Sequence, residues 1–406
     1  MESSHPYLTR GQLWLMATAC GVSVANICYN QPLLGDFAST FHANARTVGL
    51  VATATQTGYG LGILFLLPLG DLVDRRKLTL ALVTLCALFL AATALSPNLP
   101  FLIATQFLIG ITAINAQILI PFAAELSAPN RRGHTIGVLF GGLLYGILLA
   151  RVVAGVIGEH WGWRILFGLA AAAMVALGVA LRGNLPHRLP SQTMSYRRLM
   201  QTLFQLFATQ PILRRAAVIS GLSFASFTAF WTVLSFLMAE KFHLGATAAG
   251  LFGLAGAVGA WAAPAIGHFS DRRGPAFTIG VALVLTAAAF ALMGVWVSLP
   301  VLVIGVILMD LGIQSLQVAA QSRVLALIPD AGSRLNTLYM VGRFIGGAVG
   351  SALGAIAWAR WNWTGLCVLA IGFNLLALLW HAWDLLASRR AAQAGAASVI
   401  TPASAG

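Results

Sequence analysis

Residues 70–76 read Gly70-Asp71-Leu72-Val73-Asp74-Arg75-Arg76, and this stretch separates one long apolar segment from the next. A close copy, Gly267-His268-Phe269-Ser270-Asp271-Arg272-Arg273, follows 197 residues later. Two further pairs are each 200 residues apart: Trp161-Gly162-Trp163 with Trp361-Asn362-Trp363, and Gln117 with Gln317. Three coincidences at nearly one offset predict that the chain consists of two similar halves.

Apolar segments fill most of the chain on both sides of these repeats. Of its 406 residues, 59% are hydrophobic and only 9% are charged, and the mean hydropathy is +0.85. About a quarter of a soluble domain is charged, whereas about 20 apolar residues cross the ~30 Å hydrocarbon layer of a bilayer. We therefore expect an all-α membrane protein with twelve transmembrane helices in two pseudo-symmetric six-helix bundles. The predicted helices are residues 12–35, 46–70, 77–96, 99–124, 134–158, 162–182, 213–239, 247–270, 275–296, 299–324, 334–358 and 362–386.

The predicted helices divide the chain into five parts. A cytoplasmic N-terminus at 1–11 leads into a first bundle at 12–182 and a polar cytoplasmic linker at 183–212. A second bundle at 213–387 leads into a small, polar tail at 388–406, which we expect to be disordered. No small-residue cleavage site follows the first apolar run, so we expect this helix to be retained and not removed as a signal peptide.

The basic residues are distributed unevenly between the two membrane sides. The net charge is +13, and 18 of the 24 lysines and arginines fall on the side that would hold both termini. Only four fall on the other side, and Arg151 and Arg343 lie inside predicted helices. This asymmetry predicts cytoplasmic termini. The surplus charge is thus a topology signal, with attraction to anionic lipid headgroups as a consequence, and we expect the bilayer and not nucleic acid as the partner.

Half of the glycines lie in every third predicted helix. The segments 46–70, 134–158, 247–270 and 334–358 hold 21 of the 42 glycines. Lipid supplies no hydrophobic drive between helices, so helices approach closely where their residues are small. This period predicts tightly packed helices between two halves that move against each other, which indicates a transporter.

Several local motifs match one known family. They are the G-x-x-x-D-R pattern of residues 70–75, Val24-Ala25-Asn26-Ile27-Cys28-Tyr29-Asn30-Gln31-Pro32, Gly162-Trp163-Arg164, Phe227-Thr228-Ala229-Phe230-Trp231 and Asn336-Thr337-Leu338-Tyr339-Met340. With these motifs almost the whole chain resembles the major facilitator superfamily, near its bacterial drug:proton antiporter branch. The resemblance implies the major facilitator fold and a monomer in the bacterial inner membrane that exports drugs or metabolites against protons. The chain departs from the branch at Gln106, where an arginine is usual, and at Ala150-Arg151, where Gly-Pro is usual.

Asp310 and Arg343 are the candidates for proton coupling. Asp310 lies about eleven residues into its helix, hence ~16 Å deep at 1.5 Å per residue, where a carboxylate is costly and faces a cavity or a partner. Arg343 lies at a similar depth, and we expect the two to pair. The pair is either loosened by proton or substrate binding or permanent and structural. Gln314, Gln317 and Gln321 extend Asp310 into one polar stripe, which is either functional or a structural hydrogen-bond seam.

The resemblance also implies which helices line the substrate cavity, and parallel repeats place that cavity near the midplane. The candidates on those helices are amide and aromatic residues with few charges, which suits a neutral or amphipathic solute. For the aromatic residues, ordinary packing is the alternative. Besides the glutamine stripe, the candidates are Asn26, Tyr29, Asn30, Gln31, Gln106, Asn115, Gln117, Phe224, Phe227 and Trp231.

In the family, the repeated loop motif latches the cytoplasmic ends of the two halves together. The resemblance assigns this role to Gly70, Asp74 and Arg75, with Glu125 placed to receive Arg75. Gly267, Asp271 and Arg272 are the echo in the other half. The alternative is that these charges only anchor the topology.

Arg151 is left open between a gate and an interfacial anchor, with Asp36 or Glu159 as a possible counter-charge. The four cysteines are scattered through apolar helices without metal or redox spacing, so we expect buried hydrophobic side chains.

Among functions, proton-coupled efflux of a small amphipathic compound or metabolite comes first. Proton-coupled uptake of a sugar or organic acid is the alternative, and a polytopic membrane enzyme is a more distant one, because no cluster of acids, histidines or nucleophiles converges. The sequence has no ion-filter motif, which argues against a channel, and no nucleotide-binding motif, which argues against an ATP-driven pump. The expected energy source is a proton gradient, without a cofactor.

Overall fold

The computed structural model describes residues 7–187, 194–261, 270, 272–328 and 331–400, and these residues form helices, turns and loops without a β-strand. The helices are α1 (Arg10–Ala25), α2 (Leu34–Phe41), α3 (Ala45–Phe65), η1 (Pro68–Asp71), α4 (Arg75–Ala94), α5 (Leu99–Thr112), α6 (Asn115–Glu125), η2 (Pro129–Arg131), α7 (Arg132–Trp161), α8 (Trp163–Asn184), α9 (Tyr196–Thr209), α10 (Pro211–Phe242), α11 (Ala246–Trp261), α13 (Pro275–Val295), α14 (Leu299–Leu325) and α15 (Gly332–Ile400).

Nine helical stretches in the described part of the chain are long and apolar enough to cross a membrane. One of them, within α15, is two crossings, because the backbone leaves the helix at Asn362 (φ 51°, ψ −145°) and reverses direction. The broken helix α1–α2 and the shorter apolar helix α11 provide the remaining two crossings. The all-helical fold and the expected twelve crossings are therefore confirmed.

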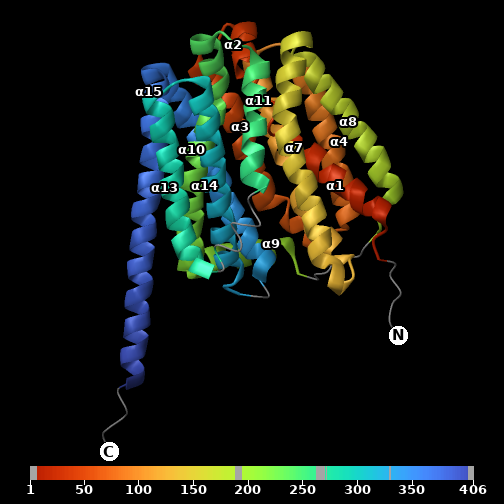
Figure 1. Cartoon of the computed structure of the whole chain (residues 1–406). Helices are drawn as coiled ribbons and strands as arrows, with labels where there is room; N and C mark the ends of the chain where they lie inside the picture. The colour runs from red at the N-terminus through yellow and green to blue at the C-terminus, as the bar shows by residue number, and fades with distance from the viewer. Residues whose placement is uncertain (1–6, 188–193, 262–269, 271, 329–330, 401–406) are drawn as a thin grey trace, which may run out of the picture.

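The two halves of the chain lie side by side, with helices α1 to α8 in one and α10 to α15 in the other (Figure 1). Both termini and α9 are at one end of the molecule, which we call the terminal end; α2 and the α7–α8 turn are at the far end. The repeat appears in the packing. A methyl group on Gly21 would lie 2.6 Å from the carbonyl oxygen of Gly142, and one on Gly221 would lie 2.8 Å from that of Gly342.

The halves meet along two helix pairs, α3 with α15 and α7 with α11, and all four helices come from the glycine-rich segments. A methyl group on Gly49 of α3 would lie 2.3 Å from the Cβ of Ala355, and one on Gly155 of α7 would lie 2.4 Å from the carbonyl oxygen of Ala246. Only glycine permits such approaches, as the period-three pattern predicted.

A row of glycines on one face of α15 makes contacts within the second half and not between the halves. Gly346 and Gly350 pack against the α10 backbone at Gly221 and Ala225, so this stripe holds the second half together internally.

The first predicted helix is broken, contrary to expectation. Helix α1 ends at Ala25, residues 26–33 form turns with i→i+3 backbone hydrogen bonds, and α2 begins at Leu34. Pro32 lacks the N–H that a continuous helix needs, and its ring collides with the preceding turn. The predicted helix 99–124 is also interrupted, between α5 and α6, where the Asn115 side chain donates to the carbonyl oxygen of Thr112.

The predicted linker and the predicted tail are both partly helical. The linker 183–212 contains the amphipathic helix α9, which buries Leu199, Met200 and Leu203. Helix α15 continues to Ile400, through the first part of the tail that we expected to be disordered. The tail is rich in alanine, which has the highest helix propensity; residues 401–406 lie outside the described part.

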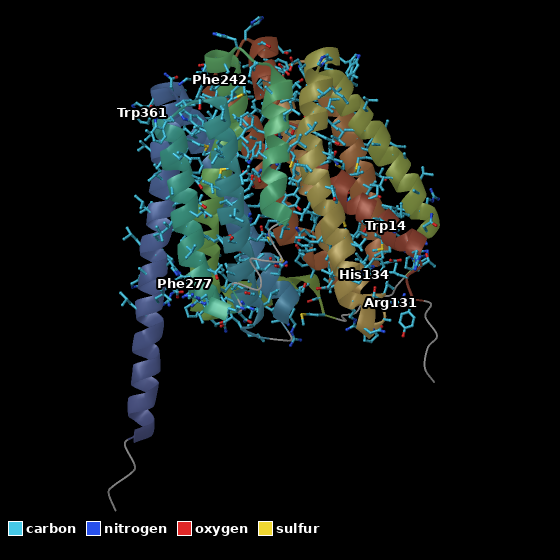
Figure 2. The ribbon with its side chains drawn as sticks, in the orientation of Figure 1. Trp14, Arg131, His134, Phe242, Phe277 and Trp361 are labelled. Atoms are coloured by element: carbon cyan, nitrogen blue, oxygen red, sulfur yellow. The ribbon has the colours of Figure 1, made fainter. Side chains whose placement is uncertain are left out.

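Exposed aromatic residues lie near both ends of the molecule. Trp361 lies at the far end, where Phe242 is half-buried, whereas Trp14 lies toward the terminal end, on the same side of the view as Arg131 and His134 (Figure 2). Trp361 and Trp14 are 62% and 64% exposed, as expected for rings at the boundary between hydrocarbon and headgroups.

Candidate functional site

A cavity of about 820 Å³ lies between the two halves. Near the middle of the molecule it is lined by Gln31, Arg151, Asp310 and Arg343. From there it extends to the terminal end, where Arg75 of α4 and residues 331–334 at the start of α15 line it. In the described part of the chain, residues of the far end do not line it. The cavity therefore opens toward the terminal end.

The far end is closed by direct contacts between the halves. The carboxylate of Glu159 on α7 accepts a hydrogen bond of 2.7 Å from the backbone N–H of Thr247, in the first turn of α11. The hydroxyl of Thr247 donates to the carbonyl oxygen of Gly155 at 3.4 Å. A carboxylate at a helix N-terminus satisfies a free N–H and opposes the positive end of the helix dipole.

Asp310 faces the cavity from α14 and has no hydrogen-bonding partner among the residues that the structure describes. Its side chain is 8% exposed, and its Oδ2 atom is buried without a hydrogen bond. A methyl group on Gly256 would lie 2.6 Å from Oδ2, so the α11 backbone packs directly against the carboxylate. Asp310 is thus a buried, unpaired acid in contact with the cavity.

The predicted ion pair between Asp310 and Arg343 is not formed in this structure. Arg343 instead packs against α10, where its guanidinium lies 4.0 Å from the centre of the Phe224 ring and donates to the Ser220 hydroxyl at 3.4 Å. The expectation compared only the depths of the two residues along their helices. The orientation of each helix about its own axis decides which neighbour a side chain meets.

Arg151 is the site residue that the sequence reasoning did not place. It is 5% exposed, its Nε donates to Oε1 of Gln31 at 2.8 Å, and its guanidinium lies 3.8 Å from the centre of the Trp231 ring. It does not pair with Asp36 or Glu159, the counter-charges considered from the sequence. Its electrostatic influence reaches Asp310. The signal in the sequence was a lone arginine inside an apolar segment.

The glycines of α11 make room for these charges. A methyl group on Gly253 would lie 3.1 Å from the Cβ of Arg151, and the α11 backbone meets Asp310 one turn later, at Gly256. The narrow helix face therefore lets one helix pass close to both side chains.

The structure places about half of the predicted cavity residues on the cavity wall. The lining residues among them are Gln31, Gln117, Phe224, Phe227, Gln314, Gln317 and Gln321. Gln321 donates to the side-chain oxygen of Asn336 at 2.7 Å, and Gln117 donates to the Tyr59 hydroxyl at 3.4 Å. The polar stripe of α14 thus faces the cavity, which agrees with its expected need for polar surroundings.

The other predicted cavity residues lie away from the wall, namely Asn26, Tyr29, Asn30, Gln106, Asn115 and Trp231. The amide of Asn30 donates to Thr55 at 2.8 Å and to Gln106 at 2.9 Å inside the first half. Gln106 is thus part of a buried hydrogen-bonded cluster of side chains. Buried amides need partners, and Asn30 and Gln106 find one in each other inside the first half, although Oδ1 of Asn30 and Nε2 of Gln106 stay without a hydrogen bond. The Trp231 ring lies behind the cavity wall, against the guanidinium of Arg151.

Aromatic rings form the apolar part of the wall. Phe224 and Phe227 stack with 5.4 Å between ring centres, and Phe224 meets Phe344 edge-on at 5.5 Å. Phe344 in turn contacts Tyr59 of the first half at 4.5 Å, so this cluster crosses between the halves. Aromatic lining was expected for Phe224 and Phe227; Tyr59 and Phe344 were not predicted.

The loop motif makes the expected local bonds. Arg75 donates to Glu125 at 2.9 Å, to Asp71 at 3.1 Å and to the carbonyl oxygen of Gly70 at 3.0 Å, all within the first half. Arg272 is exposed, and Gly267 and Asp271 lie outside the described residues. With the cavity open at this end, the proposed latch between the halves stays a prediction.

Asp74 caps α4 next to this cluster. Its Oδ1 accepts from the backbone N–H of Arg76 at 2.9 Å, and its Oδ2 pairs with the His187 ring at 2.9 Å. Partial burial opposes ionisation, but the two hydrogen bonds outweigh it and hold the pKa of Asp74 below its usual value.

A second charged cluster was missed by the sequence reasoning. Asp384 of α15 is fully buried and bridges Arg215 of α10 and Arg323 of α14. These three helices meet at the terminal end of the second half. The arginines had been assigned only to topology, and the distant aspartate carries no local signal that it joins them.

Comparison with known proteins agrees with this architecture. The sequence model of the Major Facilitator Superfamily matches residues 13–260 and 216–404. An Escherichia coli K12 relative named as a transporter, YgaY, is 38% identical over 93% of this chain and 97% of its own length. A Helicobacter pylori HPAG1 protein named as a probable sugar efflux transporter is 27% identical over 86% of this chain and 88% of its own length.

The fold also matches solved structures. One is a bacterial homologue of the human lysosomal transporter Spinster in an inward-facing and occupied conformation. It superimposes with a TM-score of 0.76 at 15% identity, over 95% of this chain and 98% of that one.

Proposed function

The chain belongs to the major facilitator superfamily, and from that membership we propose that it is a proton-coupled secondary transporter of a small organic compound, working by alternating access. Family and relatives make it a transporter and not the membrane enzyme considered as a distant alternative. We further propose the bacterial inner membrane as its location, with cytoplasmic termini and a monomeric chain.

One observation carries the proton coupling: Asp310 is a buried, unpaired carboxylate on the wall of the cavity. An ionised carboxylate is costly at that depth, and such residues in membrane helices mark proton relays. The proton would come from the water that fills the cavity from its open end.

Alternating access is supported by the unequal ends of the molecule. The cavity reaches the terminal end, whereas Glu159, Gly155 and Thr247 hold the far end closed. The glycine-rich pairs α3–α15 and α7–α11 bring the two halves into close contact without bulky side chains. The halves would rock about these pairs to close the terminal end and open the far end.

The first direction to consider is efflux of a small amphipathic compound or metabolite in exchange for protons, with the drug:proton antiporter branch as the model. The Helicobacter pylori relative named as a probable sugar efflux transporter supports this direction. The second candidate is proton-coupled uptake of an organic solute such as a sugar or an organic acid. Two buried arginines in the cavity, Arg151 and Arg343, favour it, because they provide a place for an acid.

Proteoliposomes of the full-length protein with an imposed pH gradient would test the proposal. Ethidium would serve as the efflux probe, and glucose and benzoate as the uptake probes, each with a pH-sensitive dye inside the vesicles. We expect flux of at least one probe class to move protons, and Asp310→Asn to abolish the coupled flux in a protein that remains folded. Glu240→Gln, which neutralises an exposed acid on α10, is the matched control. Full coupled flux in Asp310→Asn would remove Asp310 from the mechanism.

A further inference from the structure

Two guanidinium groups face the cavity without a carboxylate partner. Arg151 and Arg343 are each 5% exposed, yet neither forms an ion pair with any residue that the structure describes. Arg75 at the terminal end of the cavity, and Arg215 and Arg323 elsewhere in the protein, are each paired with an acid. Among the residues that the structure describes, Arg151 and Arg343 are thus the two buried arginines, and both lack the acid partner that these three half-buried ones have.

Their neutral contacts satisfy only part of each group. A guanidinium carries five N–H donors. Arg151 uses one of them on Gln31 and Arg343 uses one on Ser220, and each also packs against an aromatic ring of α10. Among the described residues, the Tyr339 hydroxyl beside Arg343 is a further neutral partner, so neither cation has a counter-ion there, although burying a cation without one is costly. The cavity supplies the missing acceptor only when it holds a ligand or water.

Asp310 cannot neutralise both arginines. With Asp310 ionised, the three buried charges on the cavity wall leave one positive charge in excess, and with Asp310 protonated they leave two. The other charged lining residues lie at the terminal end, where the two arginines Arg75 and Arg334 balance the two acids Asp71 and Glu125. The excess is therefore local to the middle of the cavity.

We propose that the transported compound is an organic acid with one negatively charged group, which binds Arg151 and Arg343. Planar guanidinium groups bind carboxylates with paired hydrogen bonds. The stacked rings of Phe224 and Phe227 would receive the apolar body of the compound. The proposal rests on the transport function above, because it names the ligand of the same cavity.

The sign of the interaction with Asp310 follows from its charge. The ionised carboxylate of Asp310 repels a bound anion, so neutralising Asp310 strengthens anion binding. Proton and anion then favour each other in the cavity and cross the membrane in the same direction. Such positive coupling between proton binding and anion binding matches uptake, the second direction considered above. In an exchanger, by contrast, proton and substrate compete for the site.

Isothermal titration of the purified full-length protein in detergent tests the proposal. The ligands are benzoate, 3-phenylpropionate and octanoate, each compared with its own primary amide, which has nearly the same size and no charge. We expect at least one acid to bind the wild-type protein about tenfold or more tightly than its amide, the scale of a hydrogen bond to a charged group. Equal or tighter binding of every amide would overturn the proposal, and this comparison needs no variant.

Variants then locate the anion. Arg151→Gln and Arg343→Gln should each weaken binding of the acid about tenfold or more while leaving its amide unaffected. Asp310→Asn should tighten binding of the acid. Unchanged affinity in both arginine variants, or weaker binding in Asp310→Asn, would contradict the assignment. Thermal melting checks that each variant is folded.

Failure of this inference and failure of the transport proposal are distinguishable. If ethidium or an amide moves protons in vesicles while no acid binds, the transport function stands and the anionic substrate is wrong. If an acid binds through both arginines but no probe moves protons, the binding site stands and the proton-coupled function is wrong.

Discussion

Replacing Glu159 by alanine removes the hydrogen bond that joins the two halves at the far end. In the structure, the carboxylate of Glu159 on α7 accepts from the backbone N–H of Thr247 in the first turn of α11 at 2.7 Å. The bond exists only while the far end is closed. The variant should therefore destabilise this state relative to one that is open at the far end.

The size of the effect follows from the nature of the contact. Loss of a side-chain cap costs about 0.5–2 kcal/mol, and a charge near a helix N-terminus contributes about 0.3–1 kcal/mol. Glu159 is exposed, so solvent screens the interaction. We expect a change of about 1 kcal/mol, which shifts the ratio of the two states by a factor of about five.

Accessibility of the cavity from each side measures this ratio. Gln117 lines the cavity, so Gln117→Cys is the reporter, with the native Cys20, Cys28, Cys86 and Cys367 replaced by alanine. A membrane-impermeant maleimide is added to sealed vesicles of either orientation. In Glu159→Ala, labelling from the far side should rise by up to about fivefold, and labelling from the terminal side should fall.

Glu240→Ala is the matched control, because Glu240 is also an exposed acid near the far end. It should leave both labelling rates unchanged. Equal rates in Glu159→Ala and wild type would refute the role of this bond in closure. An equal shift in Glu240→Ala would show that net charge, and not the cap, is responsible.

Three further substitutions test other parts of the structure. Asp384→Asn leaves Arg215 and Arg323 without their shared carboxylate and should destabilise the protein by about 3–5 kcal/mol, seen as a lower melting temperature in detergent. Gly346→Leu drives a side chain into the Gly221 backbone and should cost about 3 kcal/mol or more, whereas Gly168→Leu, with open space around it, should be neutral by the same melting assay. Asp74→Asn keeps the hydrogen bond to the Arg76 N–H but removes the negative charge beside His187 and the α4 N-terminus, and should slow transport without changing substrate preference in a competition assay; altered preference would contradict a purely conformational role.

The membrane-spanning helices could be predicted from the sequence because their apolar length is a local property. The bilayer acts on each segment separately, so hydropathy locates the helices without knowledge of their neighbours. The interruptions within the helices were harder to predict from the sequence. Pro32 was visible in the sequence, but the turns that replace a helix at 26–33 also depend on the buried partners of Asn30, which are Thr55 and Gln106.

The candidate site was predicted only in part. Asp310 and the glutamine stripe of α14 face the cavity because buried polar groups spaced along one helix face need polar surroundings. Arg151 was left without a role, because its partners Gln31 and Trp231 are 120 and 80 residues away in the chain. No spacing rule connects residues that meet through the packing of three helices.

What the sequence by itself determined is the number of crossings, the twofold repeat and the glycine-rich helices at which the halves meet. These follow from composition and periodicity, which act within a segment or between its two copies. Only the tertiary structure decided that Asp310 stands unpaired, that Arg343 packs on Phe224, and that the cavity opens at the terminal end. The physical reason is that a side chain's partner depends on how each helix is turned about its own axis and on how the two halves are tilted. Neither the rotation of a helix nor the tilt of the halves can be inferred from the sequence of a single segment.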